Sequence, residues 1–167
     1  MDNTKTNANL WAAFAGESQA NRKYTAFARK AEQDGHLQVA RLFRAIGAAE
    51  TVHALNHFRT LGEVKTTTEN IQAAMAGENY EVVTMYPEFL QAAQAEGEKA
   101  AERSMTWAWE VEKVHEKLYQ QALDNLGKET ESFDYYVCPV CGHTHERNAP
   151  DKCPVCGTPG SRFERIG

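Results

Sequence analysis

The chain has 167 residues, a formal net charge of −5 at pH 7 and only four cysteines. The acidic balance provides no basic surface for nucleic acid, and the longest apolar run is far too short to cross a bilayer. Without a signal peptide, the thiols are expected to stay reduced, which predicts a cytoplasmic location. The length allows one helical bundle of about 125 residues and a small module stabilised by metal.

Two long amphipathic helices are predicted in the first part of the chain. The first is expected over residues 6–33 and should end at the turn formed by Asp34 and Gly35. The second is expected over residues 36–61, where Gly62 ends it. A short turn between two long helices predicts an antiparallel hairpin.

A second hairpin is predicted further along the chain. Thr68 is expected to cap the third helix, which extends to about Gly97. Pro87 should kink this helix, because proline lacks a backbone donor and clashes with the preceding turn. The fourth helix is expected to continue to about Leu126, where Gly127 stops it.

Each of the four helices carries glutamate in the apolar stripe that should face the core. The motifs are Glu17, Glu50 with His53, Glu78 with Glu81, and Glu112 with His115. Ionised carboxylates are costly in such a stripe, and the few basic residues that face the core cannot neutralise them. Two metal cations can. One glutamate from each of two helices and Glu-x-x-His from two others form the di-iron or di-manganese arrangement of four-helix bundles.

A single Glu-x-x-His pair has a simpler explanation, because such a pair on a helix usually lies on a solvated face. Here each motif is expected near the middle of its own helix and on the buried side. Four such coincidences favour a dinuclear metal site over four solvated pairs.

All four cysteines lie in the tail of the chain, in two identical Cys-Pro-Val-Cys-Gly segments. They are Cys138, Cys141, Cys153 and Cys156. Two such pairs predict a tetrathiolate site suited to zinc or iron. Disulfides are disfavoured, because small Cys-x-x-Cys loops seldom serve as structural bridges. A structural zinc ribbon remains an alternative, since the ligands alone do not distinguish zinc from iron.

The order of these motifs resembles the rubrerythrin family over nearly the whole chain. The resemblance implies a mainly α fold: a ferritin-like four-helix bundle at 1–127, a linker at 128–136 and a small rubredoxin-like β/loop module at 137–167. The segment 77–81, Gly-Glu-Asn-Tyr-Glu, followed by Met-Tyr-Pro-Glu at 85–88, is itself similar to rubrerythrins.

The resemblance also implies an activity: a non-haem di-iron peroxidase that reduces hydrogen peroxide to water in oxidative-stress defence. Two iron ions would occupy the carboxylate site, and one iron ion in the tetracysteine site would relay electrons, with zinc as a substitute. On oxidation, Glu81 would replace His53 on one iron. Tyr24 and Tyr86 match family positions beside the cluster that hydrogen-bond its carboxylates, whereas we expect His57 not to be a ligand.

Electrons are expected to come from NADH through a separate reductase or rubredoxin, because the chain has no Gly-x-Gly-x-x-Gly element for a dinucleotide. Three other functions stay open. The bundle could act as a ferroxidase in iron storage, although storage needs no resident electron donor. It could be a zinc-stabilised scaffold, or it could reduce oxygen in place of peroxide.

The short link between the second and third helices predicts how the chain assembles. In ferritin-like connectivity these two helices are parallel, so the link must travel along the bundle. If Glu50 and Glu78 share one cluster, that distance is roughly 30 Å, at about 1.5 Å per helical residue. The segment 62–68 reaches only about 23 Å, at about 3.3 Å per residue. We therefore expect a homodimer with exchanged hairpins, the alternative being a simple up-down-up-down bundle.

Overall fold

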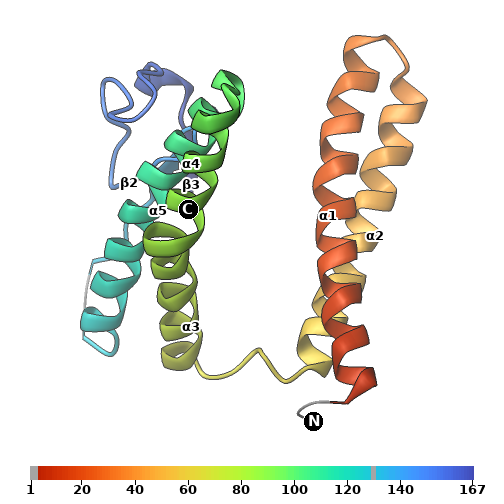
Figure 1. Ribbon diagram of the computed structural model, residues 1–167, viewed down its shortest axis with the longest axis horizontal. Helices are drawn as coiled ribbons and strands as arrows, with labels where there is room; N and C mark the ends of the chain where they lie inside the picture. Colours follow the sequence, from red (N-terminus) through yellow and green to blue (C-terminus); the bar gives the residue numbers. More distant parts are fainter. Residues whose placement is uncertain (1–3, 129–130) are drawn as a thin grey trace. The chain divides into compact units, whose positions relative to one another are not determined.

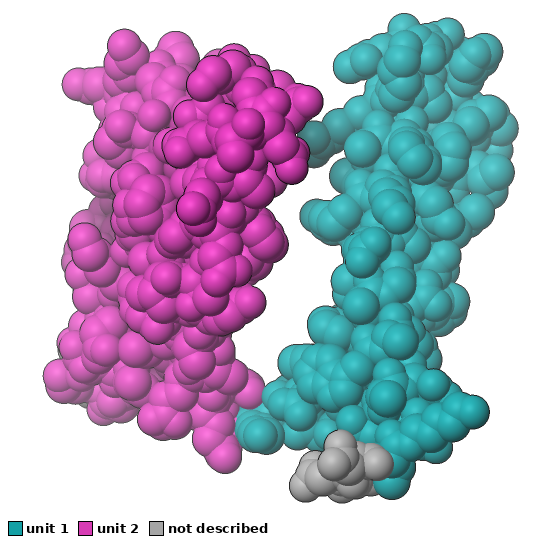
Figure 2. Space-filling view, in the orientation of Figure 1, with its two compact units in different colours: residues 1–65 teal, residues 66–167 magenta. Residues whose placement is uncertain are grey.

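In the computed structural model, the described residues are 4–128 and 131–167. The chain divides into two compact units, residues 1–65 and 66–167 (Figure 2). The fold is mainly helical, with a small β module at its C-terminal end, as predicted. None of the helices in the described ranges has an apolar stretch of the length and composition needed to span a bilayer.

Unit 1 is a hairpin of two long helices, α1 (Lys5–Gln33) and α2 (Leu37–Thr60), which lie side by side (Figure 1). The hydroxyl of Thr4 caps α1 by accepting from the backbone N–H of Asn7. Gly35 adopts φ 82°, a left-handed conformation that glycine reaches without strain, and so lets the chain reverse. Both predicted helices are confirmed to within one or two residues.

Small buried residues and aromatic pairs such as Phe14 with Phe58 form the contact between α1 and α2. The buried positions are Ala28, Ala31, Ala40, Gly47 and Ala54. Larger apolar side chains of the same helices stay exposed: Trp11, Phe27, Leu37, Val39, Leu42, Ile46, Val52 and Leu55. The hairpin therefore buries little apolar surface by itself, which leaves it without the core that a stable domain needs.

Unit 2 begins with a second hairpin. Its first arm consists of α3 (Thr67–Tyr80), a short π-helix η1 (Glu81–Met85) and α4 (Tyr86–Glu96). Its second arm is α5 (Lys99–Asn125), which contacts all three segments (Figure 1). Gly97 closes α4 in the left-handed conformation, as its position in the sequence predicted.

One local prediction for the first arm is wrong, and the structure adds one feature that was not predicted. The N-cap of α3 is Thr66, not Thr68, because Thr66 forms a reciprocal capping box with the backbone and side chain of Glu69. The structure has a π-helical turn that ends at Met85, two residues before the proline, and Pro87 lies in the first turn of α4. The lost backbone donor is thus accommodated by wider winding upstream of the proline.

The rest of unit 2 is a three-stranded antiparallel sheet with the order β2-β1-β3. The strands are β1 (Tyr135–Val137), β2 (Thr144–Glu146) and β3 (Glu164–Ile166), and a single 3₁₀ turn, η2 (Gly160–Arg162), precedes β3. Strand β2 packs against α5. This contact places the cysteine module beside the helix that carries Glu112 and His115.

Candidate metal centres

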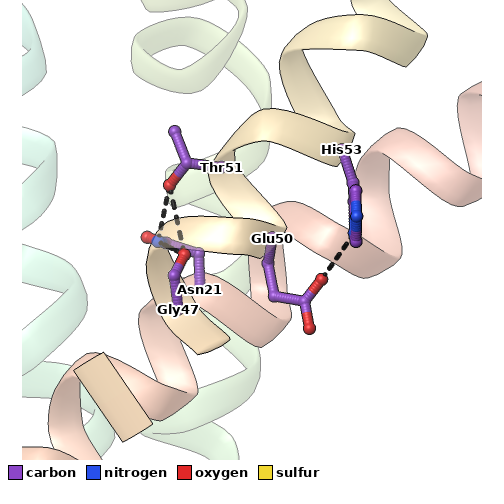
Figure 3. Close-up of polar contacts among 5 residues, drawn as sticks. All are labelled: Asn21, Gly47, Glu50, Thr51 and His53. Atoms are coloured by element: carbon purple, nitrogen blue, oxygen red, sulfur yellow. Dashed lines mark hydrogen bonds and ion pairs between the residues drawn. The ribbon is translucent and has the colours of Figure 1, made fainter. Parts of the chain in front are cut away.

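Unit 1 brings three of the predicted ligands together. The donor atoms of Glu17 on α1, and of Glu50 and His53 on α2, lie within 4.8 Å of one another. The Nδ1 atom of His53 is 2.9 Å from a carboxylate oxygen of Glu50 (Figure 3). The Glu50 side chain is only 15% exposed, so its carboxylate faces into the protein, as the helix periodicity predicted.

Asn21 fixes the relative position of the two helices that carry this group. Its side-chain amide donates to the carbonyl of Gly47 at 2.6 Å and to the hydroxyl of Thr51 at 2.8 Å (Figure 3). Asn21 follows Glu17 by one helical turn, and Gly47 precedes Glu50 by one turn. The bridge therefore holds the carboxylates of α1 and α2 in a common register.

Unit 2 brings a matching set together. Donor atoms of Glu78 on α3, and of Glu112 and His115 on α5, also lie within 4.8 Å of one another. The Nδ1 atom of His115 lies 2.7 Å from an oxygen of Glu112 and 3.9 Å from one of Glu78. In both units, histidine Nδ1 thus faces the glutamate three residues earlier on its own helix.

The electrostatics of this second group match those of a cation site. Burial and, after it, a hydrogen bond with Glu112 together raise the pKa of Glu78 to about 7. Burial also acts to raise the pKa of Glu112, but hydrogen bonds with His115 and Glu78 lower it overall. The hydrogen bond to Glu112 raises the pKa of His115. Without a metal, protons neutralise the group, and a divalent cation can replace them.

Glu81 lies outside both groups, at the first residue of η1. Burial raises its pKa, and so does the charge of Glu112, which lies near enough to act on it. Glu81 is therefore a neighbour of the unit 2 group, in a turn that is wound differently from the helix before it.

The two tyrosines and His57 have clear surroundings. Tyr24 packs against Phe27 and Phe43 in unit 1. Burial raises the pKa of Tyr86, and the charges of nearby Glu112, Glu81 and Glu78 raise it further, so Tyr86 lies beside the unit 2 carboxylates. His57 is half-buried one turn beyond His53, and in the described part of the chain it belongs to none of the metal-competent groups.

The four cysteines form a third cluster. Their sulfurs lie within 4.8 Å of one another, Cys138 and Cys153 are buried, and all four are free thiols. Cys138 Sγ lies 3.6 Å from Cys156 Sγ, and Cys141 Sγ lies 3.5 Å from Cys153 Sγ. Convergence of four unpaired sulfurs fits a tetrahedral thiolate cage.

The thiols of this cluster differ in acidity. Burial raises the pKa of Cys141. Burial acts in the same direction on Cys156, but hydrogen bonds from Thr158, whose hydroxyl is 3.1 Å away, lower the pKa of Cys156 to about 6. Cys156 therefore reaches the thiolate form, which is the form that binds metal, more readily than Cys141.

Thr144 connects the cysteine module to the carboxylate group. Its hydroxyl donates to the carbonyl of Gly142 at 3.2 Å and lies 3.1 Å from Nε2 of His115. Because the hydroxyl proton goes to Gly142, the free lone pairs of Thr144 can accept from His115 Nε2–H. That tautomer leaves Nδ1 of His115 available for a metal.

Comparison with known families agrees with this arrangement. Residues 8–123 match the model of rubrerythrin, and residues 136–164 match that of the rubredoxin-like domain of rubrerythrins. The chain belongs to the rubrerythrin family. The family assignment inferred from the order of the motifs is therefore confirmed, as are the ferritin-like bundle and the rubredoxin-like module.

Relatives match along nearly the whole chain. Rubrerythrin-2 of Clostridium acetobutylicum is 37% identical and covers 98% of both sequences. Nigerythrin of Nitratidesulfovibrio vulgaris is 36% identical over 93% of this chain and 83% of its own, and rubrerythrin of the same organism is 32% identical over 100% and 97%. The solved structure of fully reduced, all-ferrous nigerythrin covers 99% of this chain and 89% of its own, with 33% identity and a TM-score of 0.60.

Several residues that shape these groups escaped the sequence analysis. They are Asn21, Gly47 and Thr144. Their partners lie 26 or more residues away in the chain, so no local pattern marks them. A glycine inside a long helix, as at Gly47, was the one available signal, because such a glycine often marks a close helix contact.

Proposed function

We propose that this member of the rubrerythrin family is a di-iron peroxidase that reduces hydrogen peroxide to water. The observation that supports this most strongly is the pair of matching groups, each with two glutamates and one histidine, on separate hairpins of one chain. Together they offer four carboxylates and two imidazoles, the donor set of a dinuclear carboxylate site. Four carboxylates balance the four positive charges of two ferrous ions.

Two ferrous ions in this site would supply the two electrons that, with two protons, convert hydrogen peroxide to two waters. The residues of the chain hold and tune the site. Glu81 lies near enough to the unit 2 group to serve as a fifth carboxylate once the charge of the site increases, in place of His53. Tyr24 and Tyr86 would hydrogen-bond the ligating carboxylates and fix their orientation.

The tetracysteine site is proposed to hold one iron ion and to return electrons to the carboxylate site. Zinc, which four thiolates also bind, could replace that iron. The Thr144 hydroxyl, which lies between Gly142 and His115, supports this role because it makes the two sites neighbours within unit 2. Electrons would come from NADH through a separate reductase or rubredoxin, in the cytoplasm, where thiolates stay reduced. We assign residues 1–127 to the bundle. The linker predicted at 128–136 is shorter, because Tyr135 and Tyr136 belong to strand β1, and we assign residues 135–167 to the electron-transfer domain.

We further propose that two chains exchange hairpins to form a homodimer. Helix α2 ends at Thr60 and α3 begins at Thr67, so the connection reaches about 23 Å when fully extended. Glu50 and Glu78 lie roughly 15 Å and 17 Å along their helices from these ends. A parallel arrangement of α2 and α3 in one bundle therefore requires roughly 30 Å. The large apolar side chains exposed on unit 1 are the surface that unit 2 of a second chain would cover.

The test of the carboxylate site uses two glutamates of α5. Glu112→Ala removes a charge that solvent cannot replace, so we expect loss of dinuclear iron and a fall in peroxide turnover of more than about 100-fold, with iron retained by the cysteines. Glu110→Ala is the matched control, because Glu110 is exposed and pairs with Lys113. Wild-type turnover in Glu112→Ala would refute the assignment.

The test of the electron route separates supply from chemistry. After chemical reduction, Cys153→Ser should react once with hydrogen peroxide as the wild type does, because the carboxylate groups are unchanged. It should not turn over with a reductase and NADH. Loss of the single reaction would show that the module contributes to the chemistry itself.

A further inference from the structure

The π-helix η1 contains a backbone carbonyl that its own segment does not satisfy. The N–H of Tyr86 donates to the carbonyl of Glu81, five residues earlier. In the same pattern, the carbonyl of Val82 would accept from residue 87. That residue is Pro87, which has no N–H. A half-buried carbonyl without a donor is destabilising, so the π turn needs an external partner.

Trp109 of α5 supplies that partner. Its indole N–H donates to the carbonyl of Val82 at 2.8 Å, in a partly buried position. The ammonium of Lys113 lies 3.6 Å from the centre of the Trp109 ring, where a cation makes the indole N–H a stronger donor. Trp109 thus stands in for the donor that Pro87 lacks.

The two residues joined by this bond each neighbour a site carboxylate. Val82 directly follows Glu81, and Trp109 precedes Glu112 by three residues on the same helix. Because rotation of the η1 backbone moves the Glu81 side chain with it, a contact at Val82 restrains the position of Glu81. The rigid segment from Trp109 to Glu112 then relates that position to the rest of the unit 2 group.

We propose that Trp109 is a positioning residue that holds the π turn in place of the missing Pro87 donor and so sets the position of Glu81 relative to Glu112. The role of Glu81 as a redox-dependent ligand rests on the proposed function. The support that Trp109 gives to the turn does not, and it can be measured on protein without metal.

The first experiment measures amide hydrogen exchange across residues 82–88 in the metal-free full chain. In Trp109→Phe, exchange in this segment should be about tenfold faster, because a buried hydrogen bond is lost. Trp107→Phe is the matched control: Trp107 is half-buried on the same helix and its ring stacks with Arg103. Equal exchange in the two variants would overturn the proposal.

A second variant tests whether faster exchange in Trp109→Phe reflects only a general loosening of the hairpin. Adding Pro87→Ala to Trp109→Phe restores an N–H at residue 87, which can reach the Val82 carbonyl in the pattern that Tyr86 already follows. Exchange in residues 82–88 should return to within about twofold of the wild type. Failure of this rescue would show that Trp109 acts through bulk packing, which would overturn the proposal.

A third measurement links the turn to the site through the midpoint potential of the iron-loaded carboxylate centre. A displaced Glu81 stabilises the oxidised state less, so Trp109→Phe should raise the potential in the same direction as Glu81→Gln, while Trp107→Phe leaves it unchanged. Suppose that Glu81→Gln shifts the midpoint potential but Trp109→Phe does not, although Trp109→Phe exchanges faster. This result would show that Trp109 does not set the position of Glu81. If Glu81→Gln itself has no effect, the proposed role of Glu81 fails, and the exchange data decide the role of Trp109 independently.

Discussion

Glu78 and Glu112 share a hydrogen bond, and only one of these carboxyls is easily ionised without a cation. Burial raises the pKa of Glu78 from 4.5 to about 7. A raised carboxyl pKa contributes stability below pH 4.5 that is lost as pH rises through 7. His115 acts in the same direction, since its raised pKa contributes stability that is complete below 6.5 and lost as pH rises through the folded value.

We therefore expect metal-free protein to lose stability between pH 5 and pH 8 through this group. Glu112 does not oppose the loss, because its lowered pKa contributes stability that disappears only as pH falls below 4.5. In Glu78→Gln the fall in Tm over this range should be smaller by roughly 2–4 °C, the change expected for about 1 kcal/mol in a chain of this length.

Calorimetry of the metal-free proteins at several pH values measures this difference. Glu110→Gln is the control, because Glu110 is an exposed residue of the same helix. A wild-type pH profile in Glu78→Gln would mean that Glu78 is already ionised at neutral pH.

Helix periodicity pointed to all six residues of the two carboxylate groups, but it also pointed to Glu81, which lies outside both. It placed Glu17 and Glu50 on buried faces, and the structure brings both together with His53. It could not predict Asn21 or Thr144, because their hydrogen bonds join segments that become neighbours only in the folded chain.

At the scale of elements, the contact between α1 and α2 depends on a small residue at position 47, which is Gly47. A Cβ atom there would lie 3.6 Å from Cβ of Tyr24 and 3.9 Å from Nδ2 of Asn21. A methyl group fits at these distances, but a larger side chain does not. The hydrogen bond from Asn21 to the Gly47 carbonyl depends on the same close approach.

We expect Gly47→Ala to be tolerated and Gly47→Leu to destabilise the protein by about 1–3 kcal/mol, because leucine would push α1 away from α2. Gly16→Leu is the matched control: Gly16 is a helical glycine of the same hairpin with open space around its Cβ position. Both leucines improve helix propensity, so the difference between their denaturation midpoints isolates the helix contact. Equal midpoints would show that the helices can separate at little cost.

Glycines and capping residues predicted the ends of the long helices well. The prediction misplaced the N-cap of α3 by two residues, because three consecutive threonines, Thr66 to Thr68, all suit a cap. The decisive feature was Glu69, which completes a capping box only with Thr66. The π-helix escaped prediction because its winding depends on Trp109 of another helix as well as on Pro87.

For the whole molecule, exchange of hairpins makes a prediction about mixtures. Glu50→Ala damages the ligand group of unit 1, and Glu112→Ala damages that of unit 2. When the two variants are unfolded together and refolded, an exchanged mixed dimer pairs one intact unit 1 with one intact unit 2. Up to about half of the sites in each mixed dimer should then regain peroxide turnover.

Native mass spectrometry of the refolded mixture should establish that mixed dimers form, and each variant refolded alone gives the background. Mixed dimers that remain inactive would show that each chain closes its own site. The bundle would then have up-down-up-down topology, in which the connection between α2 and α3 does not have to travel along the bundle.

Because unit 1 precedes unit 2 in the chain, the order of synthesis on the ribosome follows the division at residues 65 and 66. The first hairpin emerges with Trp11, Phe27 and Ile46 exposed and with one of the two carboxylate groups complete. About 100 residues remain to be made, which takes about 5–20 s at ordinary translation rates. During that interval the nascent hairpin has an uncovered apolar face, and chains growing on one messenger carry the unit 2 segments that we propose cover it. Pairing of neighbouring nascent chains would therefore protect the hairpin and form the dimer in one step.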